Sequence, residues 1–346
     1  MSDALKITTL FLKDKKTRQQ WESLLYHHDI FSITDKDVLL LDQTFGIYDN
    51  QGLIATISIA SNVLKYLVID ERYRENGKLF NMLVSHAINV LASQGVFHVL
   101  VFTKLDYAKS FQYLGFSNIM TTEYGVFLEK GDQSINIFLS QLPLVKGDYT
   151  ISAIVMNANP FTKGHLYLVE EALKKSDYVY VFVVSANQSL FTSEERYQLV
   201  CQGVEHLKRV IVCQGGEYMV SLATFPSYFL KNQEEVISYQ TQLDALLFKE
   251  YIAKTLHITK RFLGEEPLSD ITKRYNNALL TYLPPEIEVE IIPRKAINHH
   301  QVISATKVRE CIRFGDLELI RQLVPITTYR FISEHLTELQ KRLDNN

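Results

Sequence analysis

The chain has 346 residues, of which 47% are hydrophobic and 22% are charged, with 14 glycines and 8 prolines. This composition is typical of globular proteins and excludes collagen-like, low-complexity and disordered classes. The formal net charge of −3 argues against nucleic acid or an anionic membrane as a partner of the chain as a whole. The length favours two domains.

Cysteine usage and the N-terminus indicate a cytoplasmic protein. Cys201, Cys213 and Cys311 are an odd number without a C-x-x-C spacing, so they predict neither a disulfide framework nor a zinc site. Asp3 and Lys6 lie where a secretion signal would need a basic cap and an apolar run. No stretch approaches the ~18 apolar residues of a membrane span. We therefore expect neither export nor insertion into a membrane.

The first half of the chain predicts an α+β domain. β-Branched and aromatic residues over 45–60, interrupted at Asp49 to Gly52, predict a β-hairpin, and a further strand is expected over 64–70. Apolar residues then recur at helical spacing from Leu79, and Gly95 should end that helix. A strand from Phe97 and a short helix from Ala108 follow.

The start of this helix resembles a motif of the GNAT acetyltransferases. In that family a Q/R-x-x-G-x-G/A loop holds the CoA pyrophosphate with backbone N–H groups at a helix N-terminus, and Arg74 to Leu79 occupies the matching place. The run FQYLGF, 111–116, resembles the family's late helix-to-strand signature. The resemblance implies a GNAT-like domain over 1–130, with Arg74 and Gly77 binding the arm of a CoA-like group. The simpler interpretation is that Gly77 only lets the chain turn into the helix.

The second half predicts an α/β domain with a parallel sheet. Residues 131–148 show no sustained periodicity and are expected to be a linker. From 149 to 346, short apolar strands alternate with helices, which is typical of a Rossmann-like fold whose sheet is covered on both faces. The expected strands begin near Thr150, Tyr178, Arg209, Lys260 and Val289.

The loop Asn157 to His165 is the first candidate for a binding site. It follows what should be a central strand, and ligands of open parallel sheets bind beyond the carboxyl ends of the strands. A helix N-terminus attracts phosphate, Gly164 permits close approach, and Thr162 and His165 supply hydrogen-bond donors. A histidine at a helix start is by itself more often a cap or a surface residue.

This loop resembles the N/D-P-x-H/T-x-G-H motif of the nucleotidyltransferase superfamily. Ile303 to Arg309 resembles its second motif, I-S-S-T-x-x-R, with Ala305 in place of a serine and Ser304 as the expected N-cap. Arg309 alone could belong to a solvated helix face. Together the motifs imply that His165, Thr162 and Arg309 are catalytic. The residues implied in ATP binding are Asn157, Asn159, Pro160, Phe161, Gly164, Ser304, Thr306 and Lys307.

Five further segments, with both motifs and the front domain, resemble the citrate lyase ligase family over essentially the whole chain. They are FPSYFLK (225–231), a helical stretch over 234–256, RFLGEEP (261–267), ITKRYNNAL (271–279) and EIIPR (290–294). The resemblance implies an ATP-dependent ligase that activates acetate as acetyl-AMP. The acetyl group would then pass to the thiol of a CoA-like prosthetic group on the acyl carrier subunit of citrate lyase. Mg²⁺ is expected to accompany the triphosphate, held mainly by phosphate oxygens, with no protein ligand identified.

Two alternatives remain open at this stage. The shared motifs also suit an adenylyltransferase that joins AMP to a phosphorylated small molecule in cofactor synthesis. A non-catalytic module that senses nucleotides would bind ATP without turnover. Exchange of pyrophosphate with ATP distinguishes the three functions.

Overall fold

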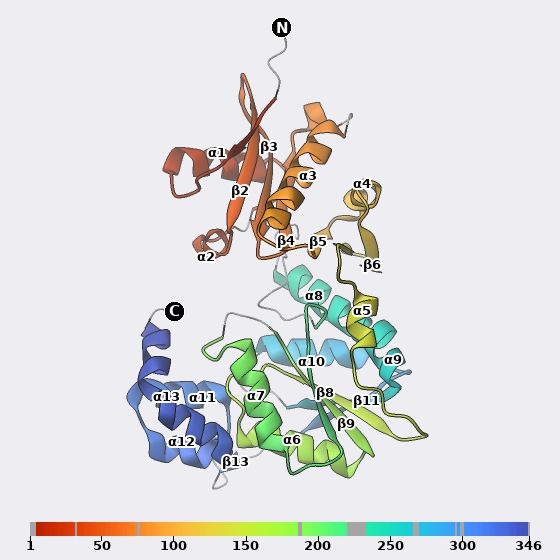
Figure 1. Cartoon of the computed structure of the whole chain (residues 1–346), viewed down its shortest axis with the longest axis vertical. Coiled ribbons are helices and arrows are strands. Elements are labelled where there is room, and N and C mark those ends of the chain that lie inside the picture. Colours follow the sequence, from red (N-terminus) through yellow and green to blue (C-terminus); the bar gives the residue numbers. More distant parts are fainter. Residues whose placement is uncertain are drawn as a thin grey trace. The chain divides into compact units, whose positions relative to one another are not determined.

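The computed structural model describes residues 5–31, 33–74, 77–185, 189–219, 233–265, 270–294, 296–297 and 301–344. The chain forms two compact units, Met1–Phe138 with Pro226–Tyr239 and Leu139–Phe225 with Gln240–Asn346. Each unit has its own sheet (Figure 1). Each also has its own hydrophobic core.

The first unit contains a seven-stranded sheet in the order β1-β2-β3-β4-β5-β7-β6. Its strands are β1 (Ile7–Thr9), β2 (Gln43–Asp49), β3 (Gly52–Ala60), β4 (Val63–Ile69), β5 (Val99–Thr103), β6 (Ser117–Thr121) and β7 (Val126–Lys130). The helices along this half are α1 (Lys15–Tyr26), α2 (Asp35–Leu39), η1 (Glu71–Tyr73), α3 (Lys78–Ser93), η2 (Leu105–Tyr107), α4 (Ala108–Tyr113) and α5 (Ile135–Ser140). The expected hairpin, strands and helices are confirmed, and Gly95 follows α3 at φ 78°.

Strands β4 and β5 pair over a short distance. The other neighbouring strands of this sheet are antiparallel, whereas β4 and β5 are parallel and pair at Val63↔Leu100 and Leu64↔Val101. Beyond these positions the two strands continue without pairing to each other. This separation leaves an opening in the sheet toward their carboxyl ends.

Helices cover both faces of the first sheet. Leu83, Val84 and Ala87 of α3 are fully buried in one core cluster, and Trp21 of α1 is fully buried in another. The indole Nε1 of Trp21 donates to Thr56 Oγ1 at 3.1 Å, which satisfies a buried polar pair. Burying a side chain such as Leu83 stabilises the fold by roughly 1.5–3 kcal/mol.

The second unit contains a five-stranded sheet in the order β10-β9-β8-β11-β12, with all neighbours parallel. Its strands are β8 (Ile151–Met156), β9 (Tyr178–Val183), β10 (Val210–Gln214), β11 (Ile258–Gly264) and β12 (Glu288–Ile292). A separate antiparallel pair is formed by β13 (Ala296–Ile297) and β14 (Gln301–Val302). The parallel sheet is confirmed, and β8 is its central strand.

The helices of this half supply the layers around the sheet. They are α6 (Lys163–Lys174), α7 (Ser193–Val204), α8 (Gln233–Leu247), the π-helix η3 (Phe248–Ala253), α9 (Lys254–Leu256), α10 (Asp270–Tyr282), α11 (Ala305–Phe314), α12 (Leu317–Leu323) and α13 (Ile326–Asp344). One core cluster joins Ile154 of β8 to Val169 of α6, Leu199 of α7, Val308 of α11 and Ile332 of α13. The helices that carry both motifs therefore pack into the same core.

The domain boundaries drawn from the sequence stay a prediction. The compact units divide between Phe138 and Leu139, and α5 lies within the segment 131–148 that was expected to be a linker. Among the described helices, none has the length and apolar character needed to cross a membrane.

Candidate active site

The loop from Asn157 to Thr162 connects β8 to the start of α6. Thr162 is the N-cap of α6, and its Oγ1 accepts a hydrogen bond from His165 N at 3.3 Å. In return, Thr162 N donates to His165 Nδ1 at 3.0 Å. A glutamate or glutamine usually provides this second bond of a capping box. Here the imidazole provides it, so the ring is held in place at the helix N-terminus.

These contacts define the protonation state of His165. Because Nδ1 accepts from a backbone N–H, the proton of the neutral ring lies on Nε2. Burial and, as a smaller cause, the positive charge of Arg294 together lower the pKa of His165 to about 4. The ring stacks on Phe161, with centroids 5.8 Å apart and planes at 13°. At pH 7 His165 is therefore a neutral hydrogen-bond donor through Nε2.

The second motif forms the N-terminus of α11. Ser304 is its N-cap, as expected, and its Oγ accepts from Lys307 N at 3.2 Å. Arg309 Nη2 donates to Thr306 Oγ1 at 3.0 Å, while Lys307 Nζ pairs with Glu310 at 3.1 Å. The cap and two basic residues thus lie within the first turns of one helix, where the helix dipole is positive.

The two motifs lie side by side. Arg309 Nη1 donates to Asn159 O at 2.7 Å, which joins α11 to the loop after β8. At Gly164, an added Cβ would stand 3.4 Å from Ile303 O, so the start of α6 faces the residue before the Ser304 cap. Segments far apart in the sequence therefore meet here, as the paired motifs predict.

Lys163 provides a second link between these parts of the fold. Its Nζ donates to Arg321 O at 3.1 Å and to Gln322 O at 2.9 Å, near the C-terminus of α12. A cation is favourable at a helix C-terminus, where carbonyl groups lack partners within the helix. Lys163 therefore fixes α6 against the helix that follows the second motif.

The asparagines of the loop bond to the protein itself. Arg196 Nη1 donates to Asn157 O at 2.9 Å and to Asn157 Oδ1 at 2.8 Å, while Asn159 Oδ1 accepts from Phe191 N at 3.1 Å. Arg196 is fully buried and also donates to Phe191 O and Val184 O. These bonds hold the loop in shape, and the role of both asparagines in binding ATP stays a prediction. The following bond, Asn159–Pro160, is cis.

Sequence reasoning missed two arginines near this site. Arg196 gave no signal because its acceptors lie on three separated segments. Arg294 ended a segment noted for its resemblance, and its position just beyond a strand was a usable signal, but no role was assigned. Its Nε donates to Glu265 O at 2.6 Å.

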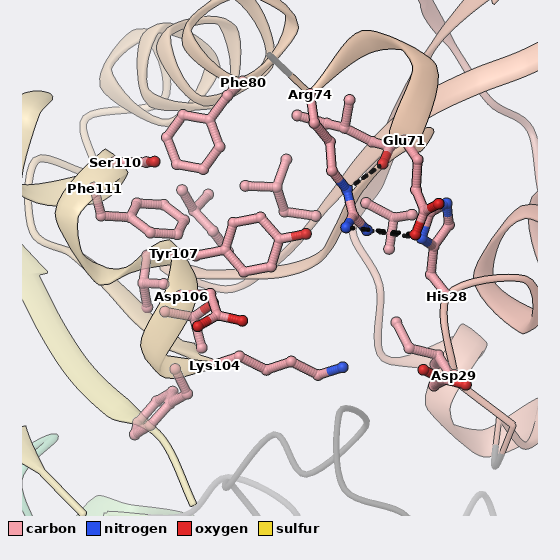
Figure 2. A pocket seen from close by; sticks show the side chains of 18 of the residues that line it. His28, Asp29, Glu71, Arg74, Phe80, Lys104, Asp106, Tyr107, Ser110 and Phe111 are labelled. Atoms are coloured by element: carbon pink, nitrogen blue, oxygen red, sulfur yellow. Dashed lines mark hydrogen bonds and ion pairs between the residues drawn. The ribbon is translucent and has the colours of Figure 1, made fainter. Parts of the chain in front are cut away.

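The first unit contains a cavity of about 400 Å³ at the opening between β4 and β5. Figure 2 shows aromatic side chains from α3, η2 and α4 on one side of the cavity and Glu71 and Arg74 on the other, while Lys104 and Asp106 lie next to the aromatic group. The aromatic group is Phe80, Tyr107 and Phe111; the charged residues of the lining are Asp29, Glu71, Arg74, Lys104 and Asp106. Arg74 and Gly77, both expected from the sequence, line this one cavity.

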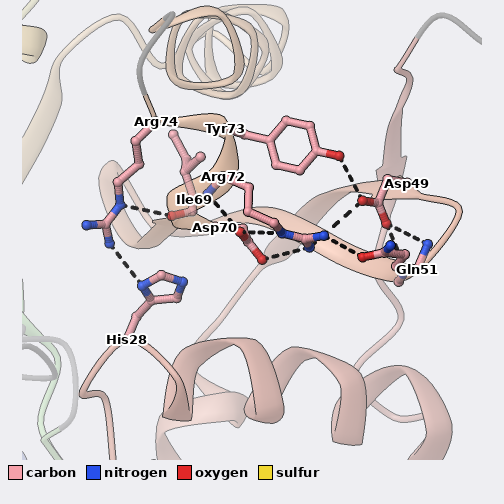
Figure 3. Close-up of polar contacts among 9 residues, drawn as sticks. His28, Asp49, Gln51, Ile69, Asp70, Arg72, Tyr73 and Arg74 are labelled. Carbon is pink, nitrogen blue, oxygen red and sulfur yellow. Dashed lines mark hydrogen bonds and ion pairs between the residues drawn. The ribbon is translucent and has the colours of Figure 1, made fainter. Parts of the chain in front are cut away.

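Arg74 is tied to the cavity wall. Its Nε donates to Ile69 O at 3.2 Å and its Nη2 contacts His28 Nδ1 at 2.9 Å, as Figure 3 shows. Burial lowers the pKa of His28, and the charge of Arg74 adds to that effect. Gly77, at φ 57°, adopts the left-handed conformation that glycine tolerates best. The loop residues Glu75 and Asn76 lie outside the described residues.

A cluster of hydrogen-bonded polar side chains lies just before Arg74 in the chain. Arg72 Nε donates to Asp70 Oδ1 at 3.0 Å, and Tyr73 OH donates to Asp49 Oδ2 at 2.8 Å (Figure 3). The turn between β2 and β3 is thereby joined to η1, the segment that leads to Arg74. Glu71, also in η1, lines the cavity.

Within the described ranges, no group of three or more His, Cys, Asp or Glu side chains could hold a metal ion. All three cysteines are free thiols; Cys213 and Cys311 are buried and Cys201 is half-buried. The segment 225–231, noted for its resemblance to the family, lies outside the described residues.

Comparison with known proteins identifies the family. Residues 151–332 match the model of the citrate lyase ligase C-terminal domain. The chain is 34% identical over 338 residues to the [citrate [pro-3S]-lyase] ligase of Klebsiella pneumoniae, covering 94% of this chain and 97% of that protein. It is 31% identical over 330 residues to the ligase of the same name from Escherichia coli, covering 93% and 92%. The chain belongs to the citrate lyase ligase family.

Solved structures resemble the two halves separately. An N-acetyltransferase from Staphylococcus aureus covers 37% of this chain and is itself covered to 98%, with 17% identity and a TM-score of 0.31. A bifunctional NMN adenylyltransferase/ADP ribose pyrophosphatase from Francisella tularensis covers 56% of this chain and is covered to 52%, with 17% identity and a TM-score of 0.36.

Proposed function

We propose that this member of the citrate lyase ligase family uses ATP to activate acetate as acetyl-AMP. The acetyl group then passes to the thiol of a CoA-like prosthetic group on the acyl carrier subunit of citrate lyase, which activates the lyase. The observation that carries the proposal is the bond from Arg309 Nη1 to Asn159 O at 2.7 Å, which joins α11 to the loop that leads into α6. Helix N-termini are favourable places for phosphate.

In the first step, an acetate oxygen attacks the α-phosphorus of ATP. The bond from that phosphorus to the bridging oxygen breaks, and its electron pair leaves with pyrophosphate. Acetate is already ionised at pH 7, so no base is required. Negative charge builds on the α-phosphate and on the leaving group, so fixed hydrogen-bond donors are what the site must supply.

Residues at the N-termini of α6 and α11 supply these donors to different phosphates. Neutral His165 donates from Nε2 to the α-phosphate, with Thr162 and Gly164 beside it. The N-terminus of α11, with Ser304, Thr306, Lys307 and Arg309, receives the β- and γ-phosphates, and Phe161 supports the imidazole from behind. Mg²⁺ bound to the triphosphate would neutralise part of its charge through phosphate oxygens.

In the second step, the carrier's thiolate attacks the carbonyl carbon of acetyl-AMP. The bond from that carbon to the phosphate oxygen breaks, AMP leaves, and the thiol proton passes to solvent. No cysteine of the chain takes part.

We further propose that the cavity of the first unit holds the pantetheine-like arm, with Arg74 and Gly77 at one end and the aromatic side chains along its length. The free thiols are consistent with work in the cytoplasm.

Exchange of labelled pyrophosphate with ATP tests the function. The full chain should catalyse exchange that depends on acetate, and His165→Ala should reduce the rate by about 10²–10³-fold, the usual cost of one transition-state donor. His206→Ala, which changes an exposed histidine at the end of α7, is the control and should keep the wild-type rate.

Other outcomes would select the alternatives. Exchange that ignores acetate but responds to a phosphorylated acceptor would indicate an adenylyltransferase. ATP binding by calorimetry without any exchange would indicate a nucleotide-sensing module.

A further inference from the structure

Gly203 lies in a helix that makes no use of its conformational freedom. It is the second-last residue of α7, it is buried, and it is not among the glycines with a positive φ in the described part of the chain. Glycine is a poor helix former compared with alanine, because it loses more backbone entropy on folding. The reason for a glycine at this position therefore lies in its surroundings.

The neighbour of Gly203 across the core is the ring of Phe161. A Cβ added at Gly203 would lie 2.4 Å from Cε1 and 2.7 Å from Cδ1 of that ring, whereas ordinary contact begins at 3.4 Å. Phe161 is fully buried and belongs to the same core cluster as Leu199 and Val200 of α7. Because cores are close-packed, the ring cannot retreat without moving its own neighbours.

Phe161 in turn contacts His165. The two rings stack with their planes at 13° and their centroids 5.8 Å apart. At its edge, the imidazole is held by the bond from Thr162 N to Nδ1 at 3.0 Å. One contact fixes the imidazole at Nδ1 and the other supports its face, so the direction of the Nε2–H bond depends on where the ring of Phe161 lies.

We propose that Gly203 is a positioning residue for His165. The space left by its absent side chain sets the place of Phe161, and Phe161 directs the Nε2–H bond of His165 toward the α-phosphate. The inference rests on the proposed adenylation. A Cβ at position 203 requires the edge of the Phe161 ring to retreat by about 1 Å, and a misplacement of that size at a catalytic group costs about 10²-fold in rate.

The test compares Gly203→Ala with Gln202→Ala, a control at the exposed neighbouring residue of α7. Acetate-dependent exchange of pyrophosphate with ATP should fall about 10²-fold in Gly203→Ala. The KM for ATP should stay at its wild-type value, because His165 acts on charge that forms in the transition state. Gln202→Ala should keep the wild-type rate. Circular dichroism confirms that each variant is folded.

A second substitution tests the contact between Gly203 and Phe161. Phe161→Leu shortens the side chain that the added methyl group meets. In the Gly203→Ala background it should recover exchange by about tenfold, whereas the losses of two independent sites would multiply. Phe161→Leu alone removes the stacked ring and should reduce exchange. If Gly203→Ala does not fold, wild-type exchange in Phe161→Leu would overturn the inference.

NMR of the imidazole nitrogens separates the inference from the proposed function, because it needs neither ATP nor acetate. The nitrogen signals of His165 report its tautomer and the bond at Nδ1, and they should shift in Gly203→Ala and return toward wild type in the double variant. Wild-type exchange in folded Gly203→Ala, or reduced exchange with unchanged His165 signals, would overturn the inference and leave the ligase function intact. Shifted His165 signals in Gly203→Ala, with no acetate-dependent exchange in the wild type, would overturn the function alone.

Discussion

The candidate active site of the second unit is closed by hydrogen bonds, whereas the cavity of the first unit is open between two strands. Around the former, Thr162 bonds to His165, Arg196 to Asn157, and Arg309 to Asn159. The cavity of the first unit begins after Leu64 and Val101, where β4 and β5 cease to pair. Hydrogen bonds between separated segments shape the candidate active site. The cavity, in contrast, lies where two neighbouring strands do not pair among the described residues.

This difference suits different ligands. A triphosphate needs donors held at fixed positions, because reorganising them during the reaction would cost energy. A long flexible arm needs room and apolar surface, which Phe80, Tyr107 and Phe111 supply along the cavity. The comparison predicts that changes in the second unit act on adenylation and stability, while changes in the cavity act on transfer to the carrier.

Removal of the Arg196 guanidinium should have the largest effect. Arg196→Met leaves the carbonyls of buried Val184 and Phe191, and that of exposed Asn157, without this donor. Each such group costs about 1–3 kcal/mol, so the free energy of unfolding of the second unit should fall by roughly 3 kcal/mol or more. Urea denaturation followed by circular dichroism measures the loss.

Trp21 makes this experiment specific, because it is the single tryptophan of the chain and lies in the first unit. Its fluorescence should report a transition in urea that Arg196→Met leaves unchanged. Arg209→Met, at an exposed arginine of the second unit, is the control and should stay within about 0.5 kcal/mol of wild type. A loss below about 1 kcal/mol in Arg196→Met would show that the loop does not depend on this residue.

Filling the cavity should separate the two half-reactions. Ser110 lies on α4 and faces the cavity (Figure 2), so Ser110→Trp should occupy space required by the arm. We expect acetylation of the carrier to slow at least tenfold, an increase of about 1.4 kcal/mol in the barrier. Acetate-dependent exchange should keep its wild-type rate.

Lys109→Trp places the same ring on the exposed side of the same helix and should leave both rates unchanged. Equal carrier acetylation in Ser110→Trp and wild type would exclude the cavity from the transfer step. An equal loss of acetate-dependent exchange in Ser110→Trp would show that the cavity does not affect carrier acetylation alone.

The smallest expected effect concerns the pH dependence of stability in the second unit. Burial by itself raises the pKa of Glu195, but hydrogen bonds from Arg342 and Thr192 outweigh it and hold the pKa below its ordinary value. Arg342 donates to both carboxylate oxygens at 2.8 Å, which joins α13 to α7. A carboxylate with a lowered pKa stabilises the fold above its unfolded pKa and loses that contribution as the pH falls through the folded pKa.

Glu195→Gln should therefore lower the free energy of unfolding by about 1–2 kcal/mol at pH 7. The difference from wild type should shrink as the pH is lowered from about 5 toward 3. Denaturation at a series of pH values measures this difference, with Glu194→Gln as the neighbouring control. A difference that stays constant with pH would assign the loss to packing instead of charge.

Local chemistry made much of the fold and the motif site predictable from the sequence. The five parallel strands were recognisable because strands buried on both faces must be apolar throughout. The caps at Thr162 and Ser304 were recognisable because each bonds within its own first helical turn. The resemblance to citrate lyase ligases added the function, which residue spacing alone left open among three possibilities.

Long-range packing decided the rest. That Arg309 reaches Asn159, that Lys163 bonds to the end of α12, and that Arg196 gathers three carbonyls depend on how separated segments meet. The cavity likewise exists because two parallel strands stop pairing, and no residue type marks that point. The residue type and its neighbours in the sequence indicate what chemistry a side chain can perform. Its partners across the core are fixed only when the whole domain packs.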